Sequence, residues 1–136
     1  MLWLLRLLFL LVLGSMIGVT SWASLQQSLF AVPREVLGNP WFIATLGDAC
    51  CGFLAFYVWV AWKEPRLVAR LLWLIAILAL GNLAMALYAL VELCRIREAG
   101  QIRDLLSRRN AGGLVFPGVL VALALAVYGA AWKSAP

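Results

Sequence analysis

The chain has 136 residues, of which 65% are hydrophobic and 12% charged, with a formal net charge of +5. Soluble domains are about 45–50% apolar and about 25% charged, so this composition excludes a water-soluble globule. It also excludes a disordered chain, which lacks apolar residues to bury. We expect residues 1–136 to form a single transmembrane domain. The excess of cations needs no nucleic-acid partner, because basic groups at helix ends meet anionic membrane lipid.

Four apolar stretches reach the ~20 residues that a helix needs to cross a bilayer. They lie at about residues 2–23, 40–62, 67–93 and 114–132. The sequence therefore predicts an all-α polytopic membrane protein with four transmembrane helices in an antiparallel bundle. The seven tryptophans support these borders, since they fall near the ends of the stretches and indole rings favour the headgroup level.

The first stretch allows two interpretations. Ser21-Trp22-Ala23 has the small-x-small pattern of a signal-peptidase site. However, four apolar residues precede Arg6, so the basic start that a signal peptide needs is weak. We expect the stretch to be retained as a span.

The distribution of cations barely distinguishes the two possible orientations of the four spans in the membrane. One face would carry five cations and the other six: Arg6, Lys63, Arg66, Arg70 and Lys133 against Arg34, Arg95, Arg97, Arg103, Arg108 and Arg109. The α-amino group and Arg6 at the start of the first span favour a cytoplasmic N-terminus. We expect a multi-pass protein of the bacterial inner membrane with both termini in the cytoplasm.

The chemistry-bearing residues do not form a catalytic set. The chain has no His and only three Cys, so neither a metal site nor a disulfide framework is expected. Glu35, Glu64 and Glu92 lie near the predicted interfaces, where we expect solvated charges. We therefore predict no enzymatic activity, no cofactor and no metal.

One acid lies within a predicted span. Asp48 is about two turns inside the stretch 40–62, where an ionisable group is costly unless it is paired or protonated. Asn82 is its expected partner, with Thr45 and Tyr88 at comparable depth. Two roles are open for Asp48: an interhelical hydrogen-bonding clamp, which we favour, or a proton relay, for which no second deep acid is present.

Each predicted span also has a face of small residues, which lets membrane helices pack closely. The expected packing positions are Gly14, Gly18, Cys51, Ala55, Ala86, Ala122, Ala126 and Gly129. The loop before the fourth span also has two interpretations. Ile102, Leu105 and Leu106 form the apolar face of a short interfacial helix, or the loop is a solvated charged segment.

Two segments resemble a known family. Residues 38–65, from Gly38-Asn-Pro-Trp-Phe-Ile-Ala-Thr-Leu-Gly-Asp48 to Trp62-Lys-Glu-Pro65, and residues 80–88, Leu80-Gly-Asn-Leu-Ala-Met-Ala-Leu-Tyr88, are similar to small four-span membrane proteins known as a domain of unknown function. The resemblance implies that the helices bearing Asp48 and Asn82 form a core hairpin. It implies no activity or cofactor.

Two functions fit these features. The first is a non-catalytic accessory or structural subunit that packs against lipid, other membrane proteins or further copies of itself. The alternative is a small carrier or lipid-handling protein, whose Asp48–Asn82 pair would line a polar intramembrane cavity.

Overall fold

The structure, a computed structural model, describes residues 1–96 and 102–133, and the regular elements within these ranges are all helical. The all-α prediction is therefore confirmed for this part of the chain. Arg97 lies outside the described residues. The elements are α1 (Leu2–Gln26), η1 (Leu29–Ala31), α2 (Arg34–Leu37), α3 (Pro40–Lys63), α4 (Leu67–Leu80), α5 (Asn82–Cys94), α6 (Ile102–Ser107) and α7 (Val115–Lys133).

Three of these helices, α1, α3 and α7, are long and apolar enough to cross a membrane. The start of α3 follows from its sequence. The Asn39 side chain accepts hydrogen bonds from the backbone N–H groups of Trp41 and Phe42, at 2.9 and 3.3 Å. Pro40 occupies the first helical position, where its missing N–H costs nothing.

The predicted span 67–93 is not one helix. Gly81 divides it into α4, of 14 residues, and α5, of 13 residues. At ~1.5 Å per residue each is only ~20 Å long, less than the ~30 Å of a hydrocarbon core. The backbone of Gly81 has φ +56° and ψ −130°, a conformation that is open essentially to glycine alone. The four-span bundle is therefore not confirmed.

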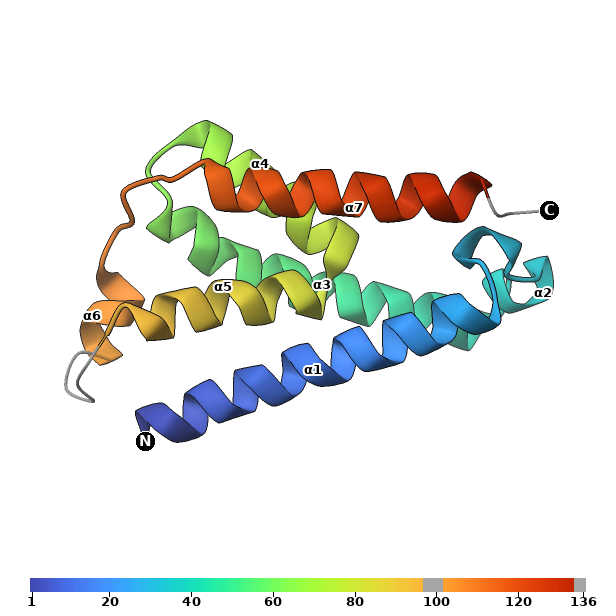
Figure 1. Ribbon diagram of the computed structural model, residues 1–136, viewed down its shortest axis with the longest axis horizontal. Helices are drawn as coiled ribbons and strands as arrows, with labels where there is room; N and C mark the ends of the chain where they lie inside the picture. The colour runs from blue at the N-terminus through green and yellow to red at the C-terminus, as the bar shows by residue number, and fades with distance from the viewer. Residues whose placement is uncertain (97–101, 134–136) are drawn as a thin grey trace.

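The two short helices form a hairpin inside the molecule. In Figure 1, α4 enters from the end where α3 finishes, and α5 returns to that same end. As a result, the start of α1 and the end of α7 lie at opposite ends of the molecule. A four-span bundle would place both at one end of the molecule.

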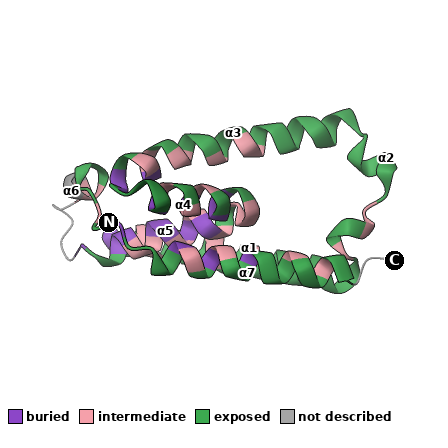
Figure 2. Ribbon diagram, turned by 90° about the horizontal axis from the view of Figure 1, so that it is seen from above, coloured by how far each residue is buried: buried purple, intermediate pink, exposed green. Residues whose placement is uncertain are grey.

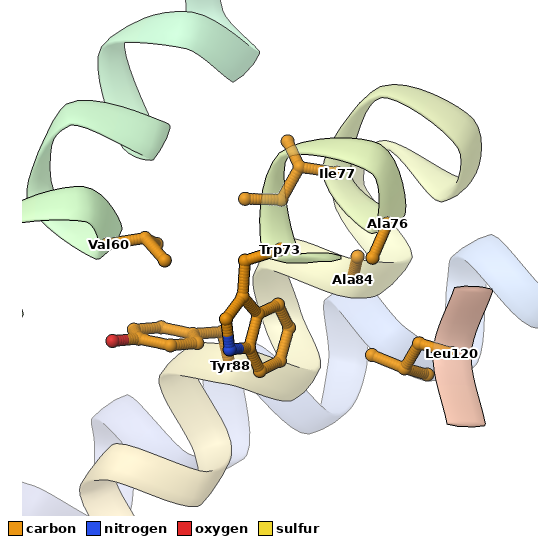
Figure 3. Close-up of a cluster of buried hydrophobic side chains, with 7 residues drawn as sticks. All are labelled: Val60, Trp73, Ala76, Ile77, Ala84, Tyr88 and Leu120. Carbon is orange, nitrogen blue, oxygen red and sulfur yellow. The ribbon is translucent and has the colours of Figure 1, made fainter. Parts of the chain in front are cut away.

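Buried residues gather around this hairpin. Figure 2 shows them on α4, α5 and the adjoining parts of α3 and α7, whereas the other halves of the long helices are mostly exposed and contain no buried residue. The main cluster contains Trp73, Tyr88 and smaller residues from four helices (Figure 3). The Trp73 and Tyr88 rings meet edge to face, with centroids 4.7 Å apart. Aromatic pairs of this geometry add stability beyond the area that they bury.

Three hydrogen bonds from two side chains, Tyr128 and Arg6, tie the hairpin and the segment after it to the long helices. The Tyr128 hydroxyl of α7 donates to the Ala79 carbonyl, 2.5 Å away, beside the break at Gly81. At the other end of the hairpin, the Arg6 guanidinium of α1 donates to the carbonyls of Leu93 and Ile96, at 3.0 and 2.8 Å. The bonds to Ala79 and Leu93 satisfy carbonyls in the last turns of α4 and α5, which have no intrahelical partners.

A substitution at Gly81 tests the break. We expect Gly81→Ala to lower the free energy of unfolding by about 1–3 kcal/mol, because a Cβ is strained at this φ and would lie 2.8 Å from the Phe53 ring. Gly129→Ala in α7 is the matched control, since a Cβ there meets nothing within 4 Å. The measurement is unfolding of the purified protein in detergent. Equal stability of the two variants would contradict the assigned break.

Candidate functional site

Six polar residues meet at the end of the molecule where α3 and α5 finish. This polar cluster consists of Lys63, Glu64, Tyr88, Glu92, Arg95 and Asn110. Tyr88 and Glu92 lie one turn apart on α5, so their side chains share a face. Lys63 is the last residue of α3, Glu64 follows it directly, and Asn110 lies in the segment that leads to α7. Chain segments far apart in sequence thus place these groups together.

Glu92 is the charged centre of the polar cluster. Its side chain is buried, forms an ion pair with the buried Lys63, and accepts a hydrogen bond from Arg95 at 2.5 Å. Lys63 Nζ also donates to the Leu105 carbonyl of α6, 2.5 Å away. A buried carboxylate needs such partners, since desolvation of an unpaired charge costs several kcal/mol.

Asn110 connects the members of the cluster. Its backbone N–H donates to the Lys63 carbonyl at 2.8 Å, and its Oδ1 accepts from Arg95 at 2.8 Å. Its Nδ2 has three acceptors: Glu64 Oε1 at 2.6 Å, Glu92 Oε1 at 3.0 Å and the Tyr88 hydroxyl at 3.1 Å. The amide has only two N–H hydrogens, so these three oxygens compete for them.

The two buried carboxylates differ in their partners. Glu64 is 3% exposed, but its carboxylate forms no ion pair with a described residue. It accepts hydrogen bonds from two neutral groups, the Tyr88 hydroxyl at 3.3 Å and the Asn110 amide. Both reach Oε1, and no side chain or backbone group of the described residues donates to Oε2. Both cations of the cluster, Lys63 and Arg95, therefore form their ion pairs with Glu92.

A cavity of about 270 Å³ lies beside the polar cluster. Glu64, Tyr88, Glu92, Arg95 and Asn110 form its polar side, and Trp73 and Phe116 are among its apolar walls. The described residues contain no group of three or more His, Cys, Asp or Glu that could hold a metal ion. The groups that line the cavity offer charges, hydrogen-bonding atoms and aromatic rings.

The predicted polar pair is not found among these contacts. Asp48 and Asn82 are both exposed, and no hydrogen bond or ion pair joins either side chain to a described residue. Thr45 donates to the Trp41 carbonyl of its own helix at 2.8 Å. Tyr88, the fourth predicted member, belongs to the polar cluster instead. Neither Asp48 nor Asn82 lines the cavity.

The predicted packing positions lie mostly on the outside. Ala86 is buried in α5. The space around a Cβ at Gly14, Gly18 or Gly129 is open. The remaining positions are exposed, namely Cys51, Ala55, Ala122 and Ala126. The small-residue faces therefore do not join α1, α3 and α7 to one another within the chain.

The expectation of solvated charges at Glu64 and Glu92 is wrong, because both are buried. The spacing of Tyr88 and Glu92 was a signal for a shared polar face, but nothing in the sequence brings Asn110 to it. Of the two interpretations of the third loop, the structure has the short helix, α6. Ile102 and Leu105 pack against a second buried cluster, whereas Leu106 is exposed.

A family model described as a protein of unknown function (DUF1475) matches residues 3–112. The chain therefore belongs to this family, and the match is wider than the two segments that carried the resemblance. No curated protein and no solved structure matches the chain.

Removal of Asn110 tests its connecting role. We expect Asn110→Ala to destabilise the protein by about 1–3 kcal/mol, because Glu64 loses its shortest hydrogen bond while it stays buried. Asn82→Ala is the matched control, since Asn82 is exposed and bonds to no described residue. Denaturation in detergent compares the two. A loss at Asn82 as large as that at Asn110 would contradict this assignment.

Proposed function

We propose that this DUF1475 protein is a non-catalytic integral membrane protein that works by binding another membrane protein. In this proposal α1, α3 and α7 cross the bilayer, and α4 with α5 forms a re-entrant hairpin from one side. The binding surface is the first half of α3, residues 40–52. The observation that carries the proposal is the exposure of Asp48 within a helix that is otherwise suited to cross a membrane.

The first half of α3 has no buried residue over positions 40–52. An acid exposed to hydrocarbon is costly, whereas one that faces a partner helix is satisfied by hydrogen bonds. Ala44, Asp48, Cys51 and Ala55 recur at helical spacing, so they share one face. Small residues around the acid would let a partner helix approach closely enough to donate to it. A partner helix with an amide, hydroxyl or basic group at this depth has the matching chemistry.

The carrier alternative has less support. It needs a polar cavity at Asp48 and Asn82, whereas the cavity described above is lined by neither. The exposed Asp48 face needs a partner, which favours the accessory subunit.

Cys51 offers a direct test, because it is exposed and shares the Asp48 face. With Cys50 and Cys94 replaced by Ser, a bifunctional maleimide should cross-link Cys51 to a partner in native membranes. Asp48→Asn should retain the adduct, since an amide still donates and accepts. Asp48→Leu should weaken association about three- to twentyfold, because membrane hydrogen bonds contribute ~0.6 kcal/mol and up to ~1.7.

A variant with only Cys94, which is exposed near the opposite end of the molecule, is the control for nonspecific reaction. A second copy of the chain as the captured partner would replace the accessory role with self-association. Equal labelling of Cys51 and Cys94, unaffected by Asp48→Leu, would contradict the binding surface.

We infer the orientation from the charges at the two ends. Among the cations whose side chains the structure describes, seven of nine lie at the end where α1 starts and α5 finishes. These are Arg6, Lys63, Arg66, Arg70, Arg95, Arg108 and Arg109, against Arg34 and Lys133 at the other end. Cytoplasmic loops carry the excess of Lys and Arg, so the N-terminus is cytoplasmic and the C-terminus is on the opposite side.

Reporter fusions test this orientation. A fluorescent reporter that folds only in the cytoplasm should be active when it is fused before Met1 and inactive when it is fused after Pro136. A periplasmic or lumenal reporter should give the opposite pattern. Activity of the cytoplasmic reporter at both positions would restore the arrangement of four spans.

A further inference from the structure

We propose that the cavity beside the polar cluster binds a small organic ammonium group, the chemistry that choline and ethanolamine share with zwitterionic lipid headgroups. The cavity is partly open to the outside and has a volume of about 270 Å³. A water molecule takes about 30 Å³ of the liquid, so there is room for a group several times its size. The site is separate from the exposed Asp48 face, and the proposal does not depend on the partner-binding function.

The hydrogen-bond partners of Glu64 indicate that the site binds a positively charged ligand. This side chain lines the cavity, is 3% exposed, and has hydrogen bonds from neutral donors to one oxygen only. Its second oxygen lacks a donor among the described residues. A cation in the cavity would form the ion pair that the Glu64 carboxylate lacks. The attraction between the two charges is stronger in a medium of low dielectric than in water.

Aromatic rings select an organic cation over a metal ion. Trp73, Tyr88 and Phe116 all line the cavity, and Trp73 lies 5.7 Å from Phe116 between ring centroids. The faces of aromatic rings attract ammonium groups, and cages of such rings recognise choline and methylated amines. Metal ions instead need several strong ligands, and the described residues contain no group of three or more His, Cys, Asp or Glu that could hold one.

The other charges at the site favour a zwitterion. Lys63, Glu92 and Arg95 complete the charged part of the polar cluster, whose formal charge with Glu64 is zero. Arg95 also lines the cavity, and its side chain is half exposed while it donates to Glu92 and Asn110. An ammonium group beside Glu64 and a phosphate near Arg95 would leave the site neutral. This arrangement fits a phospholipid headgroup at the membrane surface.

A matched pair of small molecules tests the sign. Choline and its neutral carbon analogue 3,3-dimethylbutan-1-ol have nearly the same shape and differ in charge. Choline chloride should raise the thermal unfolding temperature of the full chain in a nonionic detergent, in a saturable way and at constant ionic strength set with NaCl. The same rise with the neutral analogue, or no saturable rise with choline, would overturn the proposal.

Three variants locate the effect. Glu64→Gln should weaken the choline response at least tenfold. Phe116→Leu, which leaves the ion pairs in place, should weaken it about two- to thirtyfold, the range of one cation–π contact. Glu35→Gln, at the other end of the molecule, should respond as the unmodified chain does. If Glu64→Gln fails to fold, Phe116→Leu still decides, and an unchanged response in this variant overturns the proposal.

Native mass spectrometry then distinguishes the two sources of the ammonium group. If a lipid supplies it, the protein should carry phosphatidylethanolamine or phosphatidylcholine that choline displaces and that Phe116→Leu retains less. If a free amine supplies it, choline should bind without displacing lipid. Displacement of phosphatidylglycerol, an anionic lipid, would instead contradict a site for cations.

Discussion

The positive φ of Gly81 is the constraint on which the rest of the structure depends. A side chain at this position would favour one continuous helix over residues 67–93, long enough to cross a bilayer. The reversal instead returns α5 to the end where α4 began, which places Tyr88 and Glu92 beside the end of α3. The same reversal gives α7 the direction of α1. The polar cluster and the separation of the two chain ends therefore have one cause.

A helical hairpin that turns within the molecule needs hydrogen-bond partners for the backbone groups at its turn, here called the apex. It also needs partners for the charges at its open end, the mouth, where α4 starts and α5 finishes. Tyr128 donates to the Ala79 carbonyl near the apex, and Arg6 donates to carbonyls at the end of α5. At the mouth, Glu92 has two cationic partners and Asn110 connects the loop before α7 to α3. The distribution of charge is uneven, however, because the carboxylate of Glu64 has neutral donors alone, while Arg70 donates to its backbone carbonyl. Because the Glu64 carboxylate has no cationic partner among the described residues, we treat the polar cluster as a candidate binding site as well as a structural element.

The sequence predicted the helices better than it predicted their arrangement. Hydropathy located α1, α3 and α7 because each is a continuous apolar stretch with recognisable ends, such as Asn39-Pro40. It merged α4 and α5, because one glycine in an apolar stretch changes hydropathy little while it changes the backbone direction completely. The site was missed for a related reason. At the ends of straight spans Glu64 and Glu92 would be solvated, whereas in the structure the hairpin and Asn110 bury both.

The two ends of the molecule differ in how many of their side chains find partners within the chain. At the end with the polar cluster, side chains from α3, α5 and the loop before α7 bond to one another, so this end is held together from within. At the other end, η1 packs Phe30 against Tyr128 and Trp132, but the facing half of α3 buries none of its residues. A membrane helix with small residues and an acid on one exposed face gains stability only from a neighbour. In the proposed function, the hairpin anchors the protein at the internally bonded end, and the exposed first half of α3 is the surface left for a partner.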